Sequence, residues 1–343
     1  MSHSHKAASK KKQQTSSPAL PPMAAVASLP NPISLDAYLV FYNDMNQQLG
    51  VVQQFKSDLG QPLFNFNSQA TPDVPTGEIA NPSAISAVIF DSMINVYGVL
   101  NGTTKGDLLL CKVSPGFALL NIGDPPLATT NSIAACSDGK QTGSLFYLVE
   151  TADRGYRIRV ITLPGISTSQ EIQFSLQFNP TSYLGAAYGS LPGQPADAYV
   201  AVQDIDGYIH VVSQHSGLSG QIEDGAGLQN TPIACLFIGT SLIIYFFSPA
   251  STSGISKLCR AITVDLNSFS FRTISEAPNP NGYTQLAAFS NPSSANAGLG
   301  SVILTYVQNG SNVLVSWQDS LSGFQEELAK VSEGGDDVEL EDY

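Results

Sequence analysis

Charged residues are scarce in this chain of 343 residues, at 13% against the usual ~25%. The 15 basic residues are outnumbered by 28 acidic ones, so the net charge is −13 and nucleic acid is excluded as the main ligand. No apolar run approaches the ~20 residues of a membrane-spanning helix, and the first residues form no apolar leader segment. We therefore expect no membrane span and a cytoplasmic location.

Cysteine and histidine are also few, with four of each. No Cys-x-x-Cys pair is present, and the cysteines lie in apolar segments, where a free thiol behaves as a small buried hydrophobe. These residues are Cys111, Cys136, Cys235 and Cys259. Beyond the N-terminal pair, the histidines are His210 and His215, too few for a zinc site. No phosphate-binding or nucleophile-elbow motif precedes a helix, so neither a metal ion nor a cofactor is expected.

Glycine and proline are plentiful, with 29 and 21 residues, which is typical of an all-β protein with many turns. Residues 1–21 are rich in Lys, Ser, Pro and Gln, and residues 333–343 are dominated by acidic side chains. Neither end carries enough apolar surface to offset the entropy of ordering. We predict one domain over residues 22–332 between a disordered tail and an acidic disordered tail.

A repeat runs through this domain. Runs of small apolar residues recur six times at intervals of 47 to 62 residues, anchored at Ala25, Ala87, Ala135, Ala187, Ala234 and Ala288. Each is followed by a run rich in aromatic and β-branched residues, a tight polar turn, a third apolar run and, in most units, a weaker fourth run. The weak fourth runs include 170–176, 268–272 and 324–330, the last of which also suggests a helical turn.

Six units of four strands predict an all-β, six-bladed β-propeller with four antiparallel strands per blade. In such a ring the first strand of each blade faces the axis, where backbones converge and large side chains collide. Small residues confined to the first run fit this arrangement. Neither a β-helix nor a pair of sandwiches explains that restriction.

The repeat resembles the fungal fucose-specific lectin family. The resemblance is carried by the small residues of the first runs and by the second runs at Leu39–Asn43, Tyr199–Gln203 and Leu304–Gln308. It implies fucose sites between blades, built from an Arg at the head of strand 2, a Glu in strand 3 and stacking Trp or Tyr rings. At the Arg position this chain has Leu39, Asn95, Leu145, Tyr199, Leu242 and Val302, and no third run offers a matching Glu. All six family-type sugar sites are therefore expected to be lost.

The same fold resemblance extends to fungal propeller proteins of secondary metabolism that act as cofactor-free pericyclases, hetero-Diels-Alderases that join a tropolone quinone methide to a sesquiterpene. It implies a small lipophilic metabolite as partner, held in a water-poor pocket with a few hydrogen-bond donors. We assign donor roles in catalysis to His210, Tyr97 and Tyr245. Substrate contacts are assigned to Tyr147, Tyr306 and Trp317, because phenol and indole rings offer an apolar face and one donor.

Two other functions stay open: a glycan-binding propeller with rearranged sugar sites, and a protein-interaction scaffold. Hydrolysis by a carboxylate pair is a further alternative, since Glu150, Asp153, Asp204 and Glu223 are available but their separation is not given by sequence. The turn Asp204–Gly207 opens like a calcium loop but lacks the closing Glu, so it is read as a hairpin turn. The oligomeric state is left open.

Overall fold

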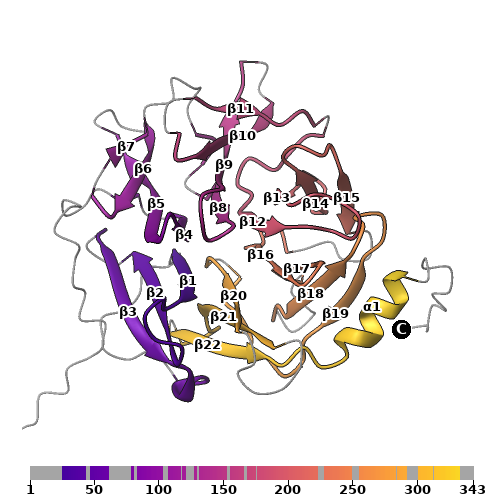
Figure 1. The fold of residues 1–343 in the computed structure, drawn as a ribbon. Helices are drawn as coiled ribbons and strands as arrows, with labels where there is room; N and C mark the ends of the chain where they lie inside the picture. The colour runs from indigo at the N-terminus through magenta and orange to yellow at the C-terminus, as the bar shows by residue number, and fades with distance from the viewer. Residues whose placement is uncertain are drawn as a thin grey trace, which may run out of the picture.

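A computed structural model shows the chain as a ring of six antiparallel sheets around a central axis (Figure 1). It describes residues 25–332 except for 44–46, 62–78, 81–82, 103–106, 117, 121–126, 130, 153–154, 166–167, 175, 223–227, 249–254, 283, 292–299 and 312. The predicted six-bladed β-propeller is confirmed. Both predicted tails, residues 1–21 and 333–343, lie outside the described residues.

Each blade begins with a strand beside the axis and continues outward. The first strands are β1 (Val26–Pro30), β4 (Ile85–Phe90), β8 (Ile133–Ser137), β12 (Leu184–Gly189), β16 (Ala234–Ile238) and β20 (Ala287–Asn291). The second strands are β2 (Ala37–Asn43), β5 (Met93–Asn101), β9 (Gly143–Glu150), β13 (Asp197–Gln203), β17 (Ser241–Phe247) and β21 (Ser301–Val307). The third strands are β3 (Leu49–Phe55), β6 (Leu108–Ser114), β10 (Tyr156–Leu163), β14 (Ile209–Ser213), β18 (Leu258–Thr263) and β22 (Leu314–Asp319).

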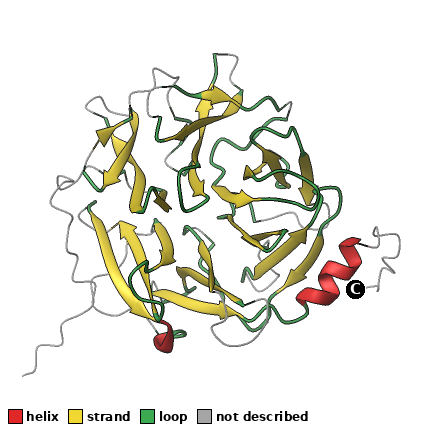
Figure 2. Cartoon of the chain, in the orientation of Figure 1, coloured by secondary structure: helices red, strands yellow, loops and turns green. Residues whose placement is uncertain are grey.

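Four blades have a fourth strand at the rim. These strands are β7 (Ala118–Leu119), β11 (Gln170–Glu171), β15 (Ser219–Ile222) and β19 (Ser270–Thr273). Blades 1 and 6, which contain the first and last described strands, have three strands each among the described residues. Figure 2 shows that strands and loops account for nearly all of the ring.

The innermost strands carry small residues because adjacent blades approach closely there. A Cβ added to Gly185 of β12 would lie 2.8 Å from the sulfur of Cys235 in the next blade. At the other end of β12, a Cβ added to Gly189 would lie 2.4 Å from the ring of Phe237. The reason predicted for small residues in the first runs is thus confirmed.

The second strands are apolar on both faces because each blade packs between two others. Every residue of β13, β17 and β21 is buried. In the part of the chain that the structure describes, a separate hydrophobic cluster lies between each pair of neighbouring blades, six in all. The core is therefore a set of interfaces around the ring, and five of them join residues about one repeat apart, while the sixth joins blades 1 and 6 from the two ends of the chain.

The ring closes between blades 1 and 6 without a shared sheet among the described residues. Strand β1 packs against β20, and a cluster that includes Tyr38 and Phe289 fills this interface, with the two ring centroids 5.4 Å apart. At the rim the backbone N–H of Gly60 donates to the carbonyl of Ser316 in β22, at 2.8 Å. Just before Gly60, the short 3-10 helix η1 (Lys56–Asp58) leads the chain out of blade 1.

The run predicted as a fourth strand or helical turn near 324–330 is an α-helix, α1 (Phe324–Ser332), which packs outside blade 5 against β18 and β19 (Figure 1). Phe324, Leu328 and Val331 recur at helical spacing and place an apolar stripe toward the ring. Acidic residues in the first turn and Lys330 in the last suit the helix dipole. Within the described residues, no helix has the length and apolar character needed to cross a membrane.

Candidate functional site

The central channel is narrow. Its walls are the first strands of all six blades, and its cavity volume is about 80 Å³. Pockets for small organic ligands usually measure ~300–1,000 Å³. The channel therefore has room for a few water molecules and not for two lipophilic reactants.

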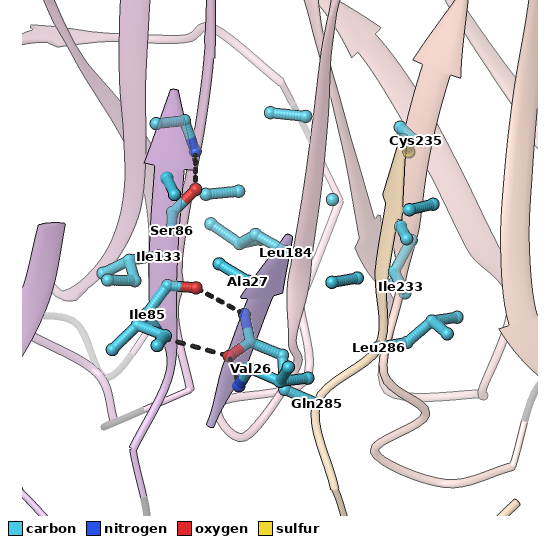
Figure 3. A pocket seen from close by; sticks show the side chains of 18 of the residues that line it. Val26, Ala27, Ile85, Ser86, Ile133, Leu184, Ile233, Cys235, Gln285 and Leu286 are labelled. Atoms are coloured by element: carbon cyan, nitrogen blue, oxygen red, sulfur yellow. Dashed lines mark hydrogen bonds between the residues drawn. The ribbon is translucent and has the colours of Figure 1, made fainter. Parts of the chain in front are cut away.

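Gln285 lies at the end of the channel where the first strands begin, and its side chain points toward Val26 and Ile85, as Figure 3 shows. Its Oε1 accepts from the backbone N–H groups of Val26 and Ile85, at 3.0 and 3.1 Å, and its Nε2 donates to the carbonyl of Ile85, at 2.8 Å. One side chain of blade 6 thereby holds the first strands of blades 1 and 2. At this end of the channel, Gln285 therefore has a structural role: it connects three blades.

The residues assigned to a pericyclase site are spread around the ring. Tyr97 lies on β5 of blade 2 and Tyr147 on β9 of blade 3, where both are buried in the cluster between those blades. Burial raises the pKa of Tyr97 to about 12. His210 lies on β14 of blade 4, while Tyr245, Tyr306 and Trp317 lie in the cluster between blades 5 and 6. The structure therefore brings three of the six residues together.

His210 is a packing histidine, buried against Phe174. Its Nε2 lies 2.8 Å from Oδ2 of Asp204. The other oxygen of Asp204 accepts from the backbone N–H groups of Asp206 and Tyr208, at 2.9 and 2.8 Å. This confirms the hairpin-turn interpretation of the Asp204 turn. Of the other carboxylates considered for hydrolysis, Asp153 and Glu223 lie outside the described residues.

The two predicted tyrosines between blades 5 and 6 are engaged in the core. Tyr245 donates its hydroxyl to Oδ2 of Asp319 at 2.7 Å, and Tyr306 donates to the carbonyl of Pro278 at 2.8 Å. Burial raises the pKa of both phenols, and the charge of Asp319 raises that of Tyr245 further. Both hydroxyls therefore stay neutral and already have acceptors.

A hollow of about 130 Å³ lies at the rim between blades 5 and 6, and we call it the blade 5/6 pocket. It is lined by Arg260, Arg272, Ile274, Glu276, Trp317, Asp319, Ser320 and Ser322. Blade 5 supplies the first four residues from β18, β19 and the loop that follows. Blade 6 supplies the others from β22 and the segment before α1. Trp317 is the only tryptophan of the chain.

The inner wall of the pocket is a saturated ion-pair network. Arg260 has 1% exposure; its Nη1 donates to Asp319 at 2.5 Å and its Nη2 to Glu327 of α1 at 2.6 Å. Nη2 also donates to the carbonyl of Ser322 at 3.1 Å. Burial lowers the pKa of Arg260, but the bonds to Glu327 and the charge of Asp319 outweigh this and raise it overall. The guanidinium is thus a fixed positive charge behind the pocket.

The outer wall presents groups that face solvent. The Arg272 side chain is 37% exposed, and its Nη1 donates to the carbonyl of Ser322 at 2.7 Å. Glu276 and Ser320 are exposed and Trp317 is half-buried. Arg272 supplies donors, Glu276 supplies acceptors, and the indole supplies a flat apolar surface with one donor. The arrangement suits a ligand with several hydroxyl groups and one apolar face.

A second polar cluster joins blades 3 and 4. Asp197 is buried, and its Oδ1 lies 2.8 Å from Nδ1 of the exposed His215. Burial raises the pKa of Asp197, but the hydrogen bonds from the side chain and backbone of His215 and from the backbone of Ser216 and Ala198 lower it overall. The side chain of Gln214 bridges to Ser144 and Thr162 of blade 3. Its partners are protein groups, so the cluster fastens the two blades.

Among the described residues, no group of three or more His, Cys, Asp or Glu side chains is arranged so that it could hold a metal ion. As predicted, Cys111, Cys136 and Cys259 are buried, and Cys235 is partly buried at the channel. Burial raises the pKa of the thiols of Cys136, Cys235 and Cys259. Protonated thiols are poor nucleophiles and poor metal ligands.

The positions compared with the lectin pattern fall on the second strands as expected. Leu39, Asn95, Leu145, Tyr199, Leu242 and Val302 lie on β2, β5, β9, β13, β17 and β21. None of the six third strands contains Glu. The arginines of the blade 5/6 pocket come instead from strands 3 and 4 of one blade. They form a different arrangement from the one the family resemblance implied.

Several solved structures with a similar fold are described as lectins. The chain matches AofleA from Arthrobotrys oligospora with a TM-score of 0.63 and 13% identity, over 87% of this chain and 83% of that one. It matches Aleuria aurantia lectin in complex with Fucα1-6GlcNAc with a TM-score of 0.58 and 14% identity, over 88% and 93%. Another structure of that lectin is described as a six-bladed β-propeller with a novel fucose recognition mode. These likenesses establish the fungal lectin-like propeller fold.

Sequence relatives are proteins named wall-associated proteinase. The one from Coccidioides immitis is 27% identical over 220 residues, which cover 62% of this chain and 69% of the relative. The one from Coccidioides posadasii is 34% identical over 128 residues, 36% of this chain and 39% of the relative. No protein-family model matches the chain.

The sequence reasoning missed Arg260, Arg272 and Glu276. One signal was present: Arg260 interrupts an otherwise apolar strand, and a buried arginine requires carboxylate partners. Its partners Asp319 and Glu327 are 59 and 67 residues away. No local pattern could identify them.

Proposed function

We propose that this chain is a carbohydrate-binding propeller whose ligand site is the blade 5/6 pocket. The observation that carries the proposal is the grouping of Arg272, Glu276 and Trp317 around one hollow between adjacent blades. Sugar hydroxyls pair well with charged donors and acceptors, and the apolar face of a sugar ring packs on an indole. The pocket thus combines the chemical groups of a lectin site at positions outside the family pattern.

The charges around the pocket disfavour an anionic ligand. Arg260, Asp319 and Glu327 together carry one net negative charge, and the outer groups Arg272 and Glu276 add one positive and one negative charge. An anionic ligand would therefore meet two arginines but three carboxylates. A neutral polyhydroxylated ligand can use Arg272 and Glu276 as hydrogen-bond partners.

Support also comes from the fold. Propellers of similar architecture are described as fucose-specific lectins or carry fucosides. Their identity to this chain is at most 16% in the matches to Aleuria aurantia lectin, so the sugar bound here need not be fucose. The feature shared with them is the six-bladed propeller fold.

The pericyclase hypothesis stays a prediction with less support. It requires a pocket that holds two reactants, a polyketide-derived diene and a terpenoid, at near-attack distance. The channel and the blade 5/6 pocket measure about 80 and 130 Å³, and neither volume can enclose two such reactants side by side. The residues assigned to it occupy several blade interfaces. The scaffold alternative has no specific observation in its favour.

Isothermal titration tests the proposal. The purified chain is titrated with methyl glycosides of fucose, mannose, galactose, glucose and N-acetylglucosamine, and Trp317 emission is recorded in parallel. We expect at least one glycoside to bind with one site per chain and to change the emission. Absence of binding by the whole panel contradicts the proposal.

Variants locate the site. Trp317→Ala should weaken binding roughly fivefold or more, because truncating an aromatic or arginine anchor at the centre of a binding site commonly costs over ~1 kcal/mol. Arg272→Met should have a similar effect. Arg159→Met, on the rim of blade 3 with Ser169 as its partner at 3.0 Å, is the matched control and should bind as the native chain does. Equal affinity in all variants would place the sugar elsewhere.

A further inference from the structure

One wall of the blade 5/6 pocket belongs to the segment that leads into helix α1. Asp319 ends β22, Ser320 and Ser322 line the pocket, and α1 starts at Phe324. Any displacement of α1 therefore moves this wall. The helix lies outside the propeller ring but is covalently next to the site.

Glu327 of α1 holds both arginines of the pocket. Its Oε1 and Oε2 accept from Arg260, at 2.6 and 3.3 Å, and its Oε1 lies 3.7 Å from Nη1 of Arg272. Glu327 is itself 6% exposed. The orientation of Arg272, which faces the ligand, thus depends on a carboxylate that arrives only when α1 is docked.

The turn before α1 packs closely against Arg272. Gly323 has φ +76°, in the left-handed region that favours glycine, and a Cβ there would lie 2.6 Å from Nη1 of Arg272. The carbonyl of Ser322 in this turn accepts from both Arg260 and Arg272, at 3.1 and 2.7 Å. The turn and helix α1 are therefore both hydrogen-bonded to the arginines of the pocket.

We infer that helix α1 is part of the ligand site and that its docking and ligand binding stabilise each other. The inference rests on the proposed carbohydrate function. Glu327 acts as a positioning residue: it touches the arginines and not the ligand. Because coupling between two equilibria is reciprocal, a ligand held by Arg272 favours docked α1, and undocked α1 lowers affinity.

The first experiment needs no ligand. Hydrogen exchange of the α1 amides and acrylamide quenching of Trp317 are measured for the native chain, Glu327→Gln and Gly323→Ala. We expect at least roughly fivefold faster exchange in α1 and stronger quenching in both variants, with blades 1 to 3 unchanged. If α1 loosens but Trp317 quenching stays the same, the helix does not shape the pocket and the inference is overturned.

Glu171→Gln is the matched control. Glu171 lies 3.7 Å from Arg157 on the rim of blade 3, and the same charge is removed there. It should leave α1 exchange and Trp317 quenching at native values. An effect of equal size in this variant would assign the result to net charge and overturn the inference.

The second experiment uses the glycoside that binds best in the panel above. We expect affinity to fall at least roughly fivefold in Glu327→Gln and Gly323→Ala, and the sugar to slow α1 exchange in the native chain. Unchanged affinity despite a loosened helix overturns the coupling. If no glycoside binds the native chain, the proposed function fails, and the helix–pocket connection is decided by exchange and quenching alone.

Discussion

Replacement of Gln285 by alanine should weaken the closure of the propeller ring. Its side chain satisfies two backbone N–H groups and one carbonyl, on Val26 and Ile85, and both of those residues have 0% exposure. Each buried group left without a partner costs ~1–3 kcal/mol. Because a water molecule in the channel can partly replace the side chain, we take the lower end of this range and expect a loss of about 3 kcal/mol.

The assay is urea unfolding followed by far-ultraviolet circular dichroism and by Trp317 emission, with thermal melting in parallel. A loss of this size should lower the melting temperature by ~6 °C, at roughly 2 °C per kcal/mol for a large domain. Gln318→Ala is the control, since Gln318 is exposed on β22 of the same blade. If Gln285→Ala changes the free energy of unfolding by less than ~0.5 kcal/mol, the level of ordinary surface substitutions, the stabilising role of Gln285 is refuted.

Gln285→Glu sharpens the test because it keeps the shape of the side chain. The carboxylate can still accept from the N–H groups of Val26 and Ile85 but cannot donate to the carbonyl of Ile85. Burial disfavours the charged form, and the protonated acid regains a donor. Its defect should therefore shrink as the pH is lowered, while that of Gln285→Ala should not.

Three further outcomes are expected. Gly189→Ala should cost roughly 1–3 kcal/mol in thermal melting, because its Cβ would lie 2.4 Å from the Phe237 ring. The pKa of Asp197 is lowered, so its ionised form stabilises the fold at neutral pH, and this stability is lost as the pH falls below the ordinary value of 3.8. In Asp197→Asn, the difference between the free energies of unfolding at pH 7 and pH 3, measured with urea, should be smaller than in the native chain. Tyr245→Phe should cost about 1.5–3 kcal/mol in urea unfolding, because its hydroxyl bonds to the charged Asp319.

The sequence could predict what repeats. The six-fold alternation of small first strands and aromatic second strands predicted the propeller, and Gly185 confirms the steric reason at the axis. The replacement of the family-type Arg could also be identified from the sequence, because Leu39 and its five counterparts are aligned by the repeat itself. Such features depend on the local sequence pattern of one blade, which recurs in all six blades.

Features that occur in only one blade, such as the Arg260 ion pairs, could not be predicted. Arg260 meets Asp319 and Glu327 only after blades 5 and 6 pack side by side and α1 folds back on the ring. The aromatic residues expected in a common pocket, such as Tyr97 and Tyr245, lie on the second strands of different blades. Equivalent positions of the repeat are distributed around the ring, so these residues lie far apart. Helix α1 did carry a signal, the helical spacing of its apolar residues, but the expectation of a fourth strand outweighed it.

Under the proposed carbohydrate function, the asymmetry of the ring bears on how tightly the chain can bind its ligand. Repeated sites on one chain raise apparent affinity through multivalency. Because the chain has a single tryptophan, a site built from an indole and an arginine can form at only one blade interface. Single-site affinity then depends on how well the pocket is organised before the ligand arrives. In the proposed site, a buried arginine network fixed by a helix provides that organisation, so α1 would contribute by positioning what repeated sites contribute by multivalency.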